Sequence, residues 1–300
     1  MKRIAFALFG LLLSSIPSLA QDCQTLLRAA ATMEAEASRA GVVQAYRRAI
    51  ESCPPTRERV AAYHALAAYQ LRTKDLPGAE TTIEAARAFI VEKFGADDLA
   101  LAGNRQLFGV TRLRRNDRDG ARDAYAVAAR IRNAKVDAWD ESEGPLGAVS
   151  HKPSGLKLPS RAGSLAQFRR DINNDDGTDV SLGYRAQRAG AISVTLYVYR
   201  PQGEFRAIFE QEKQSIRSFN PQAALQREGA QPLETKAGKI EGRLARYEYA
   251  AQAGIVATRL YLFPLKREYV KLRVTYLPAD DAFVDAQVSA LLGAIVWPAQ

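Results

Sequence analysis

Cysteine, histidine, methionine and tryptophan are all scarce in this chain of 300 residues, which contains two of each. Structural zinc sites need closely spaced pairs of cysteine or histidine ligands. Neither Cys23 and Cys53 nor His64 and His151 form such a pair, so no metal site is expected. A Gly-x-Ser-x-Gly elbow and a glycine-rich phosphate loop are also missing. The sequence therefore predicts no catalytic set and no cofactor.

Long apolar runs are missing except at the N-terminus. Two basic residues there precede an apolar run at residues 4–13 and a small-residue cleavage pattern that ends at Ala20. This order is typical of a secretory signal peptide, so residues 1–20 are expected to be removed and the mature chain to begin at Gln21. No later stretch approaches about 18 apolar residues, the length of a membrane span. We therefore expect a periplasmic or secreted protein without a membrane span.

The first half of the chain repeats itself. "GAETTIEAARAF" from Gly78 matches "GARDAYAVAARI" from Gly120, and a weaker copy, "GVVQAYRRAIES", begins at Gly41. Each phrase has helical periodicity, and a second amphipathic run precedes each one, at residues 26–37, 60–71 and 99–113. The pattern predicts three helical hairpins stacked on one another.

The hairpins bear on the two cysteines. An oxidising compartment favours one disulfide, with two buried free thiols as the alternative. In the first hairpin the start of the leading helix lies beside the end of the returning helix. This arrangement brings Cys23 and Cys53 together, so we expect them to be bonded.

Large and small residues recur at fixed places in the hairpins. The second copy has the order large, large, small, small, large, small at Tyr63, Leu66, Ala67, Ala79, Ile83 and Ala86, and the third has Phe108, Gly109, Ala121, Tyr125 and Ala128. In this pattern residues 24–135 resemble the tetratricopeptide repeat family. The resemblance implies a short curved stack of helical hairpins that binds other polypeptides along its concave side.

The second half has a different character. Residues 136–163 are rich in Gly, Ser and Pro and are expected to be a linker. Short alternating runs of β-branched and aromatic residues then predict strands, and helical patterns cover residues 205–219 and 282–295. The predicted fold is an all-α helical-repeat domain (residues 21–135) followed by an α+β domain (residues 164–300) with an antiparallel sheet flanked by helices. Its layout is similar to that of the PsbP family, a likeness that implies no function.

Four polar residues are candidates for binding a partner. In the repeat frame His64, Arg72, Gln106 and Arg114 fall on or near the inner face of the leading helices. They are expected to receive a polypeptide segment or an acidic group. The alternative is ordinary helix surface, with His64 packed against neighbouring alanines.

Most of the excess positive charge lies in the strand-rich half. In the run "YVKLRVTYL", Lys271 and Arg273 share one face of a strand, and Arg259 is expected to join them from a neighbouring strand. Such a face attracts anions, although it is also what the solvated side of a sheet looks like.

These observations favour a non-catalytic protein that binds a protein partner, or assembles other proteins, in the cell envelope. An α+β domain that binds an anionic small ligand or envelope polymer is the alternative. An enzyme with a site between the domains is the third possibility. Nucleic acid is not an expected partner of a secreted chain.

Overall fold

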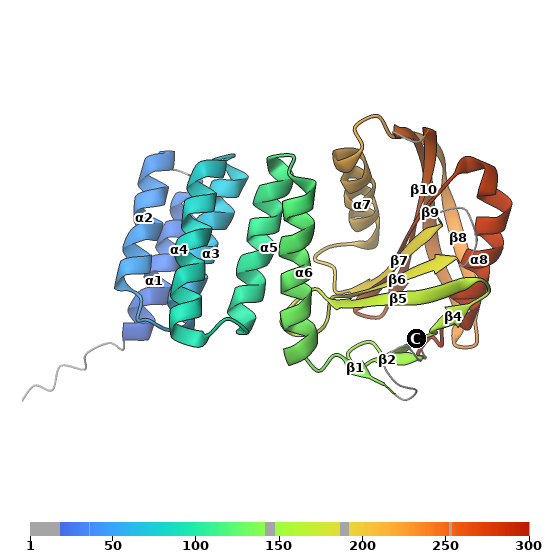
Figure 1. Cartoon of the computed structure of the whole chain (residues 1–300), viewed down its shortest axis with the longest axis horizontal. Helices are drawn as coiled ribbons and strands as arrows, with labels where there is room; N and C mark the ends of the chain where they lie inside the picture. Colours follow the sequence, from blue (N-terminus) through green and yellow to red (C-terminus); the bar gives the residue numbers. More distant parts are fainter. Residues whose placement is uncertain (1–18, 36, 142–147, 187–191, 252–253, 300) are drawn as a thin grey trace, which may run out of the picture. The chain divides into compact units, whose positions relative to one another are not determined.

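The computed structural model describes residues 19–35, 37–141, 148–186, 192–251 and 254–299 (Figure 1). The chain forms two compact units that divide between Tyr125 and Ala126. The first unit is helical and the second is an antiparallel sheet with flanking helices, which confirms the predicted fold class. Residues 1–18, most of the predicted signal peptide, lie outside the described residues.

The helical unit is built from consecutive antiparallel helices. They are α1 (Leu19–Met33), α2 (Arg39–Ser52), α3 (Arg57–Arg72), α4 (Leu76–Phe94), α5 (Leu99–Arg114) and the first part of α6 (Arg118–Lys135). Each helix from α1 to α4 contacts the next one along the chain, and the leading helices α1, α3 and α5 also contact in sequence. Between the layers lie buried apolar side chains, including Tyr46, Leu66 and Ile83. The unit is therefore a stack of hairpins in which the leading helices form one layer.

The internal repeat is visible in the turns between paired helices. Lys74 and Asn116 are 42 positions apart, and each has a φ of 62°, a left-handed conformation that is uncommon outside glycine. The residue that follows each one is an aspartate that caps the next helix. Asp75 accepts a hydrogen bond from the backbone N–H three residues later at 3.1 Å, and Asp117 does the same at 2.9 Å. The sequence repeat therefore corresponds to a repeat of local structure.

A disulfide closes the first hairpin. Cys23 in α1 and Cys53 at the end of α2 are bonded, with their Cα atoms 4.8 Å apart. Both are fully buried, and Ala62 of the next helix packs against them. This confirms the predicted pairing.

The second unit contains two antiparallel sheets. A small sheet has β1 (Trp139–Asp140), β2 (Val149–His151) and β3 (Leu156–Leu158). The large sheet has the order β4-β5-β6-β7-β11-β10-β9-β8. Its strands are β4 (Arg161–Ala162), β5 (Leu165–Ile172), β6 (Val180–Ala186), β7 (Ser193–Tyr199), β8 (Ala224–Thr235), β9 (Gly238–Ala251), β10 (Gly254–Leu265) and β11 (Glu268–Tyr276). Helix α7 (Phe205–Phe219) lies between β7 and β8 in the chain, and η1 (Pro278–Asp280) leads into α8 (Asp281–Ala294).

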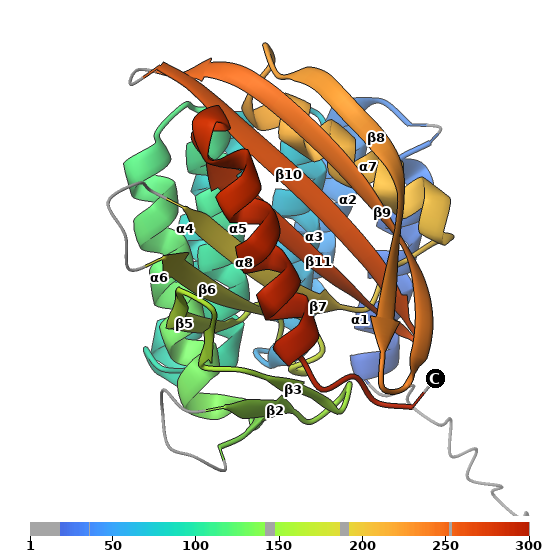
Figure 2. The same ribbon diagram turned by 90° about the vertical axis from the view of Figure 1, so that its right-hand side faces the viewer.

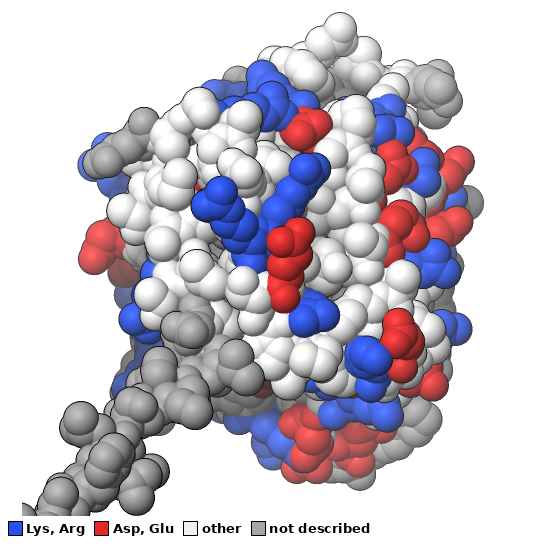
Figure 3. Space-filling view, turned by 90° about the vertical axis from the view of Figure 1, so that its left-hand side faces the viewer, with Lys and Arg blue, Asp and Glu red and all other residues white. Residues whose placement is uncertain are grey.

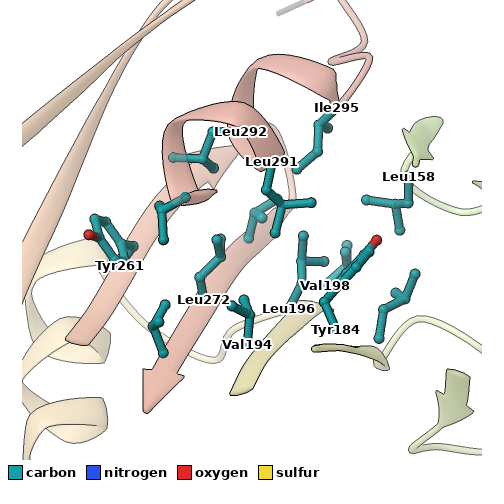
Figure 4. Close-up of a cluster of buried hydrophobic side chains, with 14 of the residues drawn as sticks. Leu158, Tyr184, Val194, Leu196, Val198, Tyr261, Leu272, Leu291, Leu292 and Ile295 are labelled. Carbon is teal, nitrogen blue, oxygen red and sulfur yellow. The ribbon is translucent and has the colours of Figure 1, made fainter. Parts of the chain in front are cut away.

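One helix covers each face of the large sheet. Helix α8 lies across one face (Figure 2), where its Leu291 packs with Leu196 and Leu272 in the main core (Figure 4). Helix α7 covers the other face over β9, β10 and β11, where Phe209 and Ile216 pack against Tyr247. Because alternate residues of a strand point to opposite faces, each strand residue belongs either to the α8 side or to the α7 side.

Residues 136–163 are not the irregular linker that the sequence predicted. They contain β1 to β4, and Val149, Leu156 and Leu158 are buried in the main core. Each of these strands has only two or three residues, too few to show a periodicity between the Gly, Ser and Pro residues of the turns.

Candidate functional site

The four predicted binding residues lie on two neighbouring leading helices. His64 and Arg72 belong to α3, and Gln106 and Arg114 belong to α5, which contacts α3. Helices α1, α3 and α5 form one layer, and we call its solvent-exposed side the leading-helix surface. The four residues lie in the α3 and α5 part of this layer. Arg72, Gln106 and Arg114 are exposed on it, whereas His64 is half-buried. The His64 ring packs on α5, with its Cε1 atom 3.4 Å from where a Cβ on Gly103 would lie. His64 therefore lies against Gly103 in the contact between α3 and α5.

Arg72 joins α3 to the end of α1. Its guanidinium donates to both carboxylate oxygens of Glu34, at 2.6 and 2.8 Å, and Tyr46 donates to the same carboxylate at 2.7 Å. Burial raises the pKa of Glu34, but the hydrogen bonds from Tyr46 and Arg72 outweigh it and hold that pKa below its usual value. The Arg72 side chain stays 57% exposed. More than half of the Arg72 side chain is therefore accessible to solvent while it is paired with Glu34.

Arg114 and Gln106 differ in their attachment. Arg114 donates to the backbone carbonyl of Leu71 in the last turn of α3, a carbonyl that also accepts a hydrogen bond from the backbone N–H of Lys74 at 3.1 Å. Gln106 makes no hydrogen bond within the described residues, so it is a position where a change tests binding without disturbing the stack. The surface at the α1 and α2 end of the helical unit is mostly uncharged in the view of Figure 3.

The predicted basic face of the sheet is divided between its two sides. Lys271 and Arg273 lie on the α7 side, but Arg259 pairs with Val274 across β10 and β11 and therefore points to the α8 side. The expectation that Arg259 joins the other two residues is wrong. Arg259 is opposite an even-numbered residue of β11, a register that the sequence does not reveal.

Arg259 is instead the centre of a buried ionic network. It is 5% exposed and donates to Asp285, to Asp281 at 2.7 Å and to the hydroxyl of Tyr276 at 2.6 Å. Arg246 of the neighbouring strand also donates to Asp281, at 2.9 Å. Burial lowers the pKa of Arg259, but its hydrogen bonds to Asp285, Tyr261 and Asp281 outweigh that effect and raise it. The network fixes the start of α8 to the sheet, so Arg259 is not available to an external anion.

Lys271 is also engaged. Its ammonium contacts Glu212 of α7 at 2.9 Å and lies 4.2 Å from the centre of the Tyr197 ring. Arg273, one pair further along the strand, is half-buried and has no ion pair within the described residues. Of the three predicted anion-binding residues, Arg273 alone has its charge uncompensated in this part of the structure.

Metal ligands and acidic loops give no further site. Within the described residues, no three His, Cys, Asp or Glu side chains are grouped so that they could hold a metal ion. The acidic segment "DINNDDGTDV" forms the hairpin loop between β5 and β6, and Gly177 adopts a φ of 72° in it. His151 is fully buried, and its Nε2 lies 2.8 Å from the carbonyl of Gly177, which links β2 to this loop.

A cavity beside α7 was not found by sequence reasoning. It is lined by Glu210, Lys213, Gln214, Arg217 and Ser218, which recur along one side of the helix. The sequence does predict the helix, and the spacing of these residues is that of an ordinary solvated helix face. The cavity could not be predicted, because the buried strand side chains beneath the helix come from a distant part of the chain.

The sequence matches no protein-family model and no curated protein. In the described part of the chain, no helix is both long and apolar enough to cross a membrane.

Proposed function

We propose that this protein is a non-catalytic binding protein of the cell envelope that holds a polypeptide partner on its leading-helix surface. The observation that carries the proposal is the exposure of Arg72, Gln106 and Arg114 on adjacent helices of one layer. Stacked helical hairpins, including those of the tetratricopeptide type that this chain resembles, offer extended surfaces of this kind. Three exposed side chains that the buried core does not use therefore support a role in binding a partner.

The partner is expected to carry acidic groups opposite the two arginines. Guanidinium groups bind carboxylates through charge-assisted hydrogen bonds, and one nitrogen of Arg72 already donates to both carboxylate oxygens of Glu34. Attraction between exposed charges weakens as salt is added, so recovery of the partner should fall with ionic strength. A place outside the cytoplasm fits the Cys23–Cys53 disulfide and the predicted signal peptide.

Two double variants test this proposal. Arg72→Ala with Gln106→Ala removes one arginine and one glutamine from the leading-helix surface. Arg48→Ala with Gln44→Ala removes the same two residue types from exposed positions on α2. Each variant, as the full chain with an affinity tag, is used to recover partners from the native envelope, and its free energy of unfolding is measured in parallel.

The first variant should lose the partner while its free energy of unfolding falls by less than about 1 kcal/mol, as is usual for an exposed ion pair. The α2 variant should retain the partner. Equal recovery by both variants would show that the leading-helix surface is not the binding surface.

A further inference from the structure

The cavity beside α7 is open to solvent on one side and has the size of a small-molecule site. Its volume is about 490 Å³, within the range of about 300 to 1,000 Å³ found for ligand pockets. Its five lining residues come from α7, and the β8 and β9 side chains that contact them are charged or aromatic. The cavity lies wholly within the second unit.

The acidic groups at this cavity are already engaged. Lys213 is buried, and its ammonium contacts Glu210 at 2.8 Å and Glu228 of β8 at 2.7 Å. Arg243 of β9 contacts the other oxygen of Glu228 at 3.0 Å. The hydrogen bond from Lys213 is the main reason that the pKa of Glu228 is lowered. Neither carboxylate is therefore left to attract a cation.

The hydrogen-bonding capacity that remains unused consists mainly of donors. Tyr247 of β9 is fully buried, and its hydroxyl has no hydrogen-bond partner. The Nε–H of Arg243 is likewise buried without a partner. Arg217 makes no ion pair within the described residues, and its guanidinium carbon lies 5.8 Å from the centre of the Tyr247 ring. A buried donor without an acceptor costs free energy, which a ligand with acceptor oxygens would recover.

The charges around Tyr247 include three residues that line the cavity, Glu210, Lys213 and Arg217. Burial raises the pKa of the Tyr247 phenol, while Arg217 and Lys213 act to lower it. Three positive side chains (Lys213, Arg217 and Arg243) face two negative ones (Glu210 and Glu228), which leaves one positive charge in excess. Arg217 is exposed, and its guanidinium lies over the ring of the buried Tyr247.

We propose that this cavity binds a small organic anion through a carboxylate or phosphate group that accepts hydrogen bonds from Arg217 and, after the Arg217 side chain changes its rotamer, from the Tyr247 hydroxyl beneath it. The excess positive charge and the unused donors both select an anionic oxygen ligand. Such a ligand would occupy a site in the second unit that is separate from the leading-helix surface.

Calorimetric titration of the full chain tests this proposal at constant ionic strength. One series uses inorganic phosphate and a second uses succinate, with chloride as the blank. Saturable binding of phosphate alone, or of succinate alone, supports the proposal and identifies the anionic group. If neither anion binds saturably, the proposal is wrong.

Four single variants then locate the site. Arg217→Ala and Tyr247→Phe should each weaken binding about tenfold, the usual effect of losing a hydrogen bond to a charged group. The matched controls are Arg206→Ala, an exposed arginine elsewhere on α7, and Tyr249→Phe, a tyrosine on the same strand as Tyr247. The controls should bind as the unchanged protein does, and unaltered binding by the first two variants would contradict the proposal.

Stability without ligand separates this role from a structural one. Since the Tyr247 hydroxyl has no partner, Tyr247→Phe should leave the unliganded melting temperature unchanged or raise it. A clear fall in that melting temperature would mean that the hydroxyl supports the fold, and would overturn its assignment to a ligand.

Discussion

Removing the Cys23–Cys53 disulfide should destabilise the helical unit alone. The bonded residues are 30 positions apart, and for a loop of that length the chain-entropy relation gives about 3.6 kcal/mol at 25 °C. In a helical unit of roughly 100 residues, this loss corresponds to a fall of roughly 15 °C in melting temperature. The perturbation is the double variant Cys23→Ala with Cys53→Ala, which keeps small apolar side chains beside Ala62.

The two units can be followed separately in one sample. Both tryptophans, Trp139 and Trp297, lie in the second unit, so their fluorescence reports on the sheet. Helices are concentrated in the first unit, so far-ultraviolet circular dichroism reports mainly on the hairpin stack. In a urea titration, the free energy of unfolding obtained from the circular dichroism transition should be about 3.6 kcal/mol lower for the variant than for the unchanged protein. Its fluorescence transition should not move.

Reduction of the unchanged protein under denaturing conditions, followed by refolding in reductant, should give the same loss as the double variant. A loss below about 1 kcal/mol would refute the argument from loop closure. An equal shift of both transitions would refute the independence of the two units.

Two further perturbations test the packing. Gly109→Ala places a Cβ within 2.6 Å of the Tyr125 ring, so the free energy of unfolding of the first unit should fall by roughly 1–3 kcal/mol. Gly293→Ala in α8 is the control: its Cβ meets nothing within 4 Å, so the free energy of unfolding should rise by up to about 1 kcal/mol. Equal effects of the two changes would contradict the assigned contact. Burial raises the pKa of Asp281, but hydrogen bonds from Tyr276 and Arg259 outweigh it and lower that pKa in the folded protein. The ionised Asp281 therefore stabilises the fold above the pKa of an unfolded aspartate, about 3.9, and this stabilisation is lost as the pH falls through the lower pKa of the folded state. Asp281→Asn should therefore cost about 1 kcal/mol at neutral pH, a figure reduced for partial exposure, and should flatten the acid limb of stability against pH, whereas an unchanged acid limb would contradict the network.

Regular elements with a clear period were predictable from the sequence. The helix expected at residues 205–219 has the same bounds as α7, and the strand run "YVKLRVTYL" became β11. Strand β8 could not be predicted from its residues, because it is an exposed edge strand with little apolar alternation and a proline at position 232. The short strands β1 to β4 were missed because they have too few residues to show a pattern.

The candidate sites were less predictable, because they depend on which face a residue takes. Lys271 and Arg273 were correctly placed together, since they are two apart on one strand. Arg259 was not, because its face depends on the register between β10 and β11. The sequence also could not show that Tyr247 lies beneath the Arg217 side chain, about thirty positions earlier in the chain, or that the Tyr247 hydroxyl has no hydrogen-bond partner.

Site-specific photo-crosslinking tests the central claim of a partner on the leading-helix surface most directly. A photoreactive amino acid is placed at Gln106, or at Gln44 on α2 as the matched control, and cells are irradiated before the envelope is solubilised. Both positions are exposed and make no hydrogen bond within the described residues, so the insertion should leave the fold intact. We predict a discrete crosslinked protein from position 106 and none from position 44. Crosslinks from position 44 alone, or from neither position, would contradict the proposed binding surface.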